Sequence, residues 1–149
     1  MTMSDSPPDT DAFAPFARQR LIDWWDQSRL AAARVLVIGA GALGNEALKN
    51  LALIGAGQIY IVDFDVIEPS NLSRAVLFRS SDAGQGLKAK IAAERVAQLN
   101  PYAGAHVAYF HGDMVWELGA GVYRLSLIHI SEPTRLRRIS YDVFCLKKK

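Results

Sequence analysis

The sequence predicts an α/β protein, the first half of a Rossmann-like doubly wound parallel sheet preceded by N-terminal helices. Two apolar runs, at 34–39 and 58–65, are typical of strands that a parallel sheet buries on both faces. Segments with helical spacing of apolar residues alternate with these strands. A glycine-rich turn joins the first strand to the next helix, as in nucleotide-binding units.

The expected elements follow one another along the chain with short connections. We expect one or two helices in 13–33, a strand at 34–39, a helix at 42–57, a strand at 58–65, a helix at 87–100, a strand at 105–112 and a short helix at 113–121. Gly55 and Gly57 end the first long helix, and Pro101 follows the end of the second.

Apolar side chains on the predicted helices are the candidates for the core. In the helix at 42–57, the residues expected to face the sheet are Leu43, Ala47, Leu51 and Leu53. Trp24 and Trp25 in the N-terminal segment are interpreted as packing residues.

Composition indicates one soluble domain, because 149 residues of which 50% are hydrophobic suit a single core. No apolar run approaches the roughly 20 residues that span a bilayer. Residues 1–14 are acidic and rich in Pro and Ser, unlike a secretory signal, and predict a disordered leader in a cytoplasmic protein.

Charge is unevenly distributed along the chain. Residues 125–149 hold six of the 17 Lys and Arg and two of the 15 Asp and Glu, so residues 1–124 carry 11 basic and 13 acidic side chains. No basic stripe indicates a nucleic-acid partner. The one cysteine, Cys145, lies in the last segment, so nothing before it predicts a disulfide, a thiolate metal site or a thiol nucleophile.

Residues 125–149 differ in character from the rest of the chain. The stretch "LSLIHISEPTR" is what a transposon-type sequencing adapter encodes in translation, and "ISYDVFCLKKK" resembles its remainder running into poly-A. We therefore expect a non-native tail, with a partial nucleotide-binding domain at 15–124 that stops in mid-domain near Arg124. The alternative is a genuine basic tail for an acidic partner.

The glycine motif Gly39-Ala-Gly-Ala-Leu-Gly44 lies between a strand and a helix, the context that phosphate binding requires. Gly39 permits the tight turn, Gly41 lets the backbone approach a phosphate, and Gly44 lets helix and strand pack closely. The first free N–H groups of the helix, from Ala42 on, would face the anion. An ordinary glycine-rich turn is the alternative.

Polar residues after the second strand bear on which nucleotide binds. Asp63 lies 19 residues beyond Gly44, where an acid reaches ribose hydroxyls, although it could be a solvated turn residue. This much fits an NAD-dependent dehydrogenase equally well. Asn71, Arg74 and Lys88 follow, and an amide and two cations in one crevice suit a triphosphate. Taken singly, the two cations could be solvated surface residues.

As an ordered set, these motifs resemble the ThiF/MoeB/HesA adenylyltransferases, the family that includes ubiquitin-activating enzymes. The resemblance covers about residues 16–124 and is carried by "VLVIGAGALGNEALKN", "DFDVIEPSNLSR", "GQGLKAK" and "LNP". The "D-F-D…S-N-L-x-R" block is its most distinctive part.

The resemblance assigns roles to particular residues. It implies that Asp63 holds the ATP ribose, with Asp65 and Ala42 in the same nucleotide site, while Asn71, Arg74 and Lys88 contact phosphates. Arg18 matches an arginine that family dimers supply to the partner's ATP, and Arg20 is a weaker candidate. The turn before Lys88 is one residue longer than the family pattern and lacks its proline, so Lys90 is an alternative phosphate ligand.

The resemblance also implies an activity. It is the ATP- and Mg²⁺-dependent adenylation of the C-terminal carboxylate of a ubiquitin-like or sulfur-carrier protein by a homodimer, with Arg74, Lys88 and Arg18 as catalytic residues. The magnesium aspartate, any zinc-binding CxxC pairs and any thioester cysteine are expected beyond Arg124, so no residue here is assigned to a metal and the 149-residue chain is expected to be inactive. An NAD(P)-dependent oxidoreductase and a non-catalytic nucleotide-binding subunit are the alternatives.

Overall fold

The structure, a computed structural model, describes residues 13–113, 117, 129–131 and 142–146. Its elements are η1 (Ala14–Phe16), η2 (Gln19–Leu21), α1 (Gln27–Ala31), β1 (Arg34–Ile38), α2 (Ala42–Leu53), β2 (Gln58–Asp63), η3 (Pro69–Asn71), η4 (Ser80–Asp82), α3 (Lys88–Leu99), β3 (His106–His111), β4 (His129–Ser131) and β5 (Asp142–Leu146), where η marks a 3-10 helix. Most of the leader, of the tail and of the helix expected at 113–121 lies outside the described residues.

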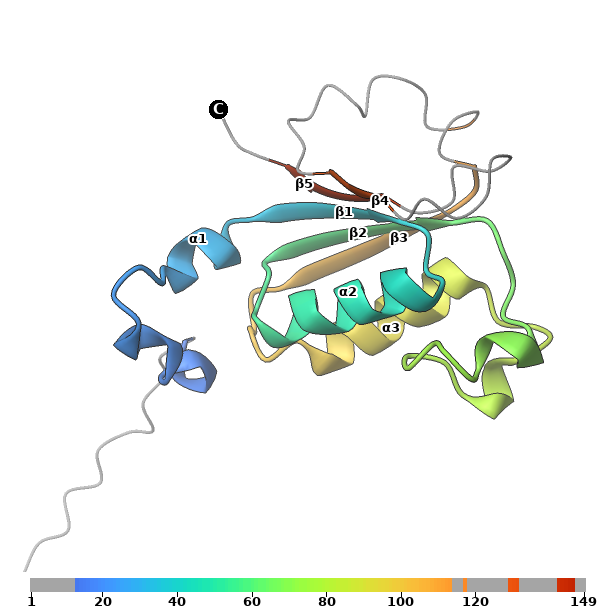
Figure 1. Cartoon of the computed structure of the whole chain (residues 1–149), viewed down its shortest axis with the longest axis horizontal. Coiled ribbons are helices and arrows are strands. Elements are labelled where there is room, and N and C mark those ends of the chain that lie inside the picture. The colour runs from blue at the N-terminus through green and yellow to red at the C-terminus, as the bar shows by residue number, and fades with distance from the viewer. Residues whose placement is uncertain (1–12, 114–116, 118–128, 132–141, 147–149) are drawn as a thin grey trace, which may run out of the picture.

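The predicted half-sheet is confirmed. β1 pairs with β2 and β2 with β3, both in parallel register. The helices α2 and α3 connect these strands and lie side by side under one face of the sheet (Figure 1). Parallel strands joined through helices on one face form the first unit of a doubly wound fold.

Two further strands extend the sheet beyond β1, in the order β3-β2-β1-β5-β4. β5 pairs with β1 in antiparallel register, and β4 pairs with β5 in the same sense. Both strands come from residues 125–149, the segment that the sequence analysis predicts to be a non-native tail. The parallel part of the sheet therefore has an antiparallel strand, β5, next to its β1 edge.

The main core lies between the sheet and the two long helices. Among its fully buried members are Val37, Leu48, Ile59, Ile61 and Val96. Burying a side chain of this size contributes about 1.5–3 kcal/mol. This core fixes the helices against the sheet and thereby the turn from which α2 begins.

The buried face of α2 differs from the predicted one. The helix buries Gly44, Asn45, Leu48 and Ala52, whereas Leu53 is 50% exposed. Leu51 of the predicted set packs against the core while only partly buried. A Cβ on Gly44 would lie 1.9 Å from the Gly39 carbonyl oxygen, so the start of the helix packs closely on the glycine turn, and Gly44 and Asn45 face inward together with Leu48.

The N-terminal segment attaches at the end of the sheet where the parallel strands begin (Figure 1). Phe16 is 1% exposed, and a Cβ on Gly55 would lie 2.3 Å from its ring. Gly55 has φ +76°, which favours glycine, and it follows α2 as predicted. The buried Gln27 amide donates to the Ile54 carbonyl at 2.8 Å. Glycine is therefore needed here both for backbone conformation and for ring packing.

The packing role expected of the two tryptophans holds for one of them. The Trp25 indole is half-buried and donates to Gln27 Oε1 at 2.9 Å. Trp24 is 79% exposed, so the expectation is wrong for this residue.

No helix in the described part of the chain is long and apolar enough to span a bilayer.

Candidate nucleotide-binding site

The glycine-rich turn lies at the carboxyl end of β1 and opens α2. Gly39 has φ 89°, a conformation that favours glycine, and its N–H donates to the Val62 carbonyl at 2.7 Å. A Cβ on Gly44 would lie 1.9 Å from the Gly39 carbonyl oxygen. Gly41 is the N-cap residue and Ala42 the first residue of α2. These observations fit the turn role expected of Gly39 and the packing role expected of Gly44, and the phosphate-binding role of Gly41 stays a prediction.

Asp63 joins the end of β2 to this turn. One carboxylate oxygen accepts from Ala40 N–H at 2.6 Å, and the other accepts from Asp65 N–H at 2.7 Å. The residue is 5% exposed. Burial raises the pKa of the Asp63 carboxyl above its ordinary value, although the two N–H donors and the Lys88 charge oppose that shift. Asp63 therefore fixes the glycine turn through Ala40 N–H. It also lies at the end of β2, where the sequence predicts a ribose-binding acid.

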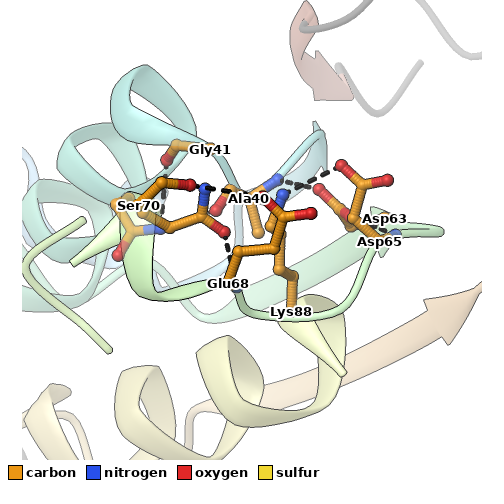
Figure 2. Close-up of polar contacts among 9 residues, drawn as sticks. Ala40, Gly41, Asp63, Asp65, Glu68, Ser70 and Lys88 are labelled. Carbon is orange, nitrogen blue, oxygen red and sulfur yellow. Dashed lines mark hydrogen bonds and ion pairs between the residues drawn. The ribbon is translucent and has the colours of Figure 1, made fainter. Parts of the chain in front are cut away.

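Lys88 lies beside the two aspartates, as Figure 2 shows. Its Nζ donates to Asp65 Oδ2 at 2.9 Å, and its backbone N–H donates to the Asp65 carbonyl at 3.0 Å. The Lys88 side chain is 8% exposed and that of Asp65 42%. Lys90, two residues further along α3, is exposed. The placement favours Lys88 over Lys90 as the cation of this site.

Asn71 and Arg74 form a separate turn in the loop between β2 and α3. Asn71 Oδ1 accepts from Glu68 N–H at 3.0 Å, and Arg74 Nη1 donates to the Ser70 carbonyl at 2.8 Å. Arg74 is exposed, and within the described part of the chain its guanidinium bonds the Ser70 carbonyl and forms no hydrogen bond or ion pair with Lys88 or the aspartates. The structure thus brings together the glycine turn, the aspartates and Lys88, and leaves the Arg74 guanidinium within its own turn.

Asn45 links the glycine turn to the chain that follows Arg74, although the sequence pattern did not single it out. The side chain is completely buried, donates to the Ala40 carbonyl at 2.7 Å and to the Gly41 carbonyl at 3.0 Å, and accepts from Leu77 N–H at 2.9 Å. Asparagine is a weak helix former, so its presence on the inner face of a helix was the available signal.

Arg18 lies far from this cluster in its own chain. It precedes η2, in the segment at the opposite end of the sheet, and is exposed. The described residues contain no group of three or more His, Cys, Asp or Glu that could hold a metal ion. The described site therefore consists of backbone donors, two carboxylates and one buried cation.

The chain is similar to known proteins in both sequence and structure. A model of the ThiF family matches residues 16–115. The chain belongs to the ThiF family. The Saccharomyces cerevisiae protein "Adenylyltransferase and sulfurtransferase UBA4" is 43% identical over 102 residues, which cover 66% of this chain and 23% of the yeast protein. The Arabidopsis thaliana protein "Ubiquitin-activating enzyme E1 2" is 52% identical over 79 residues, 50% of this chain and 7% of that protein.

Solved structures of this family share the fold. Escherichia coli MccB, solved with ATP, superposes with a TM-score of 0.55 at 31% identity over 60% of this chain and 25% of MccB. The E. coli tRNA N6-threonylcarbamoyladenosine dehydratase TcdA gives a TM-score of 0.58 at 29% identity over 66% of this chain and 40% of TcdA. The chain thus spans less than a quarter of the two curated relatives it matches, which are an adenylyltransferase and a ubiquitin-activating enzyme.

Proposed function

We propose that residues 16–115 form the ATP-binding part of an enzyme that adenylates the C-terminal glycine carboxylate of a ubiquitin-like or sulfur-carrier protein. The observation that carries the proposal is the cluster of Asp63, Asp65 and Lys88 beside the glycine turn. A buried cation next to free helix N–H groups suits polyphosphate, and a carboxylate suits ribose hydroxyls. The names of the relatives support adenylation over hydride transfer.

In the proposed reaction, the carboxylate attacks the α-phosphorus of ATP, an acyl-adenylate forms, and pyrophosphate leaves. The chain contributes position and charge: the turn and Lys88 hold phosphate oxygens, Asp63 orients the ribose, and Asn71 and Arg74 approach the departing phosphates. Arg74 must leave the Ser70 carbonyl for this role, which its exposure permits. The reaction needs no side-chain nucleophile.

The assembled enzyme requires more than the described residues. Magnesium would accompany ATP and neutralise phosphate charge, and we propose that its ligand lies in another part of the parent protein. We also propose a cytoplasmic homodimer in which Arg18 reaches the partner's site. The position of Arg18, away from its own cluster, agrees with action in trans. By the same reasoning, the 149-residue chain has no adenylation activity of its own.

The test uses a hybrid enzyme, in which residues 16–115 replace the matching stretch of the yeast UBA4 protein. ATP–pyrophosphate exchange is measured with ubiquitin-like proteins that end in a glycine carboxylate, and with the same proteins amidated at the C-terminus. We expect exchange with the carboxylates only. Arg74→Ala should lower exchange by about 100-fold, since it removes one donor to developing charge.

Arg34→Ala is the matched control, because Arg34 is an exposed arginine at the beginning of β1. It should exchange at the rate of the unmodified hybrid. A hybrid that folds but catalyses no exchange, or that oxidises a substrate with NAD(P) instead, would contradict the proposal. If Arg74→Ala leaves ATP–pyrophosphate exchange intact, the role assigned to Arg74 is wrong, while the proposed adenylation still holds.

A further inference from the structure

The Asn45 side chain uses its amide oxygen and both amide hydrogens in fixed contacts. Its oxygen holds Leu77 N–H, and its nitrogen holds the carbonyls of Ala40 and Gly41. The residue has no exposed surface, so leaving any of these groups unpaired would cost about 1–3 kcal/mol. A buried amide that joins two segments 32 positions apart restrains both of them.

The two carbonyl contacts determine where neighbouring N–H groups point. In a trans peptide the C=O and N–H of one plane point in opposite directions, and no peptide described here is cis. The Ala40 carbonyl shares a plane with Gly41 N–H, and the Gly41 carbonyl shares one with Ala42 N–H. The Asn45 side chain donates to both carbonyls, and the Gly41 carbonyl also accepts from the Asn45 backbone N–H at 2.8 Å. Through these contacts Asn45 directs both N–H groups away from the buried amide. Neither donates to another described residue, whereas Ala40 N–H is taken by Asp63.

We infer that Asn45 is the positioning residue of the phosphate site: it aims Gly41 N–H and Ala42 N–H at the anion and fastens the segment after Arg74 to the same turn. Leu77, whose N–H donates to Asn45, follows Arg74 by three positions. Short turns flank this segment, because Arg74 N–H donates to the Asn71 carbonyl and Phe78 N–H donates to the Ala75 carbonyl. The inference rests on the proposed phosphate site but not on the identity of the nucleotide, since ATP and NAD both present phosphates.

The experiment follows the amide resonances of Gly41 and Ala42 by NMR while inorganic pyrophosphate is added to the 149-residue chain. In the unmodified chain both resonances should shift on binding. Asn45→Asp keeps an acceptor for Leu77 but loses the donor to both carbonyls, so pyrophosphate affinity should fall by about tenfold or more.

Asn100→Asp is the matched control. Asn100 Nδ2 donates to the Ala56 carbonyl at 2.9 Å, and its oxygen accepts from Tyr102 N–H at 3.0 Å. It therefore undergoes the same chemical change in a similar hydrogen-bonding role after α3, at the far end of the sheet. This variant should bind pyrophosphate like the unmodified chain. An equal loss of pyrophosphate affinity in both variants would mean that Asn45 only stabilises the fold, and it would overturn the inference.

Asn45→Ser covers the case in which Asn45→Asp does not fold. A helical serine hydroxyl bonds the carbonyl four residues earlier, here that of Gly41, and would leave the Ala40 carbonyl free. The Ala42 resonance should then still respond to pyrophosphate, while the Gly41 response is lost. Equal responses in this variant, or no response of either amide in the unmodified chain, would overturn the inference. Because pyrophosphate is the probe, failure of adenylation in the hybrid enzyme would leave this result standing.

Discussion

At the residue scale, the candidate site is held together by the same polar groups that we propose bind the nucleotide. Asp63 accepts two backbone N–H groups from two different segments, and Lys88 neutralises the adjacent Asp65. A carboxylate oxygen has lone pairs to spare after one such bond, so Asp63 keeps the capacity to accept from a ribose hydroxyl. The hydrogen bonds of the candidate site are thus in place without a ligand.

The choice between Lys88 and Lys90 can be tested in the hybrid enzyme. We expect Lys88→Gln to lower ATP–pyrophosphate exchange by about 100-fold, because it removes a buried cation from the phosphates. Lys90→Gln changes an exposed residue and should leave exchange within about twofold. Both rates are measured together with thermal unfolding. The reverse order of effects would assign the phosphate to Lys90.

The raised pKa of Asp63 predicts a pH dependence of stability. The folded state binds the proton more tightly than the unfolded state, whose carboxyl has a pKa of about 3.9. The stability of the unmodified chain, relative to Asp63→Asn, should therefore be highest below that value and fall as pH rises through the raised folded pKa. Urea unfolding of both chains across this pH range measures the difference. A difference that grows with pH would show a lowered pKa instead.

At the element scale, the N-terminal segment is fastened to the domain by a few contacts at the end of α2. Phe16 packs on Gly55, and Gln27 closes the helix by bonding Ile54. Trp24 contacts Trp25 but remains largely exposed. The two aromatic positions therefore differ in what they contribute to stability.

Phe16→Ala should destabilise the chain by about 3 kcal/mol, since it removes a fully buried aromatic ring. Trp24→Ser, at a residue that is 79% exposed, should change stability by less than about 0.5 kcal/mol. Denaturant unfolding measures both, and hydrogen exchange around 13–26 should accelerate in the first variant only. Comparable losses in the two variants would mean that Trp24 is buried in solution.

At the scale of the whole molecule, one end of the sheet carries the cluster of Asp63, Asp65 and Lys88, and the other end carries the N-terminal segment (Figure 1). This separation follows from the parallel topology, because every parallel strand ends at the same edge. A single chain therefore cannot bring Arg18 near Lys88 without rearrangement. A second copy can, which is the basis of the proposed homodimer.

Mixing two inactive hybrid enzymes tests action in trans. If Arg18 serves the partner's site, a dimer of one Arg18→Ala chain and one Arg74→Ala chain has one intact site. Random mixing should then restore about a quarter of the unmodified activity, because half of the dimers are mixed and each has one active site. Unmixed samples of each variant are the controls. No recovery on mixing would place Arg18 in its own site or outside catalysis.

Much of the fold could be read from local patterns. The β-branched runs, the helices between them and the glycines at turns lie where they were predicted, because strand burial, helical periodicity and positive φ leave direct traces in sequence. The inner face of α2 was wrong, since Gly44 brings the helix against the Gly39 carbonyl and turns Asn45 inward. The antiparallel pairing of β5 with β1 was not predicted, because a local pattern does not specify which distant strand a segment pairs with.

The sequence by itself determined the parallel half-sheet, the glycine turn and the set of polar residues from which the site is drawn. Only the tertiary structure decided which of these residues contact one another. Lys88 pairs with Asp65, and Asp63 bonds the glycine turn. Arg74 bonds within its own loop, whereas Asn45 connects the glycine turn to Leu77. The physical reason is that burial and hydrogen bonding between distant segments depend on packing geometry, which spacing along the chain does not encode.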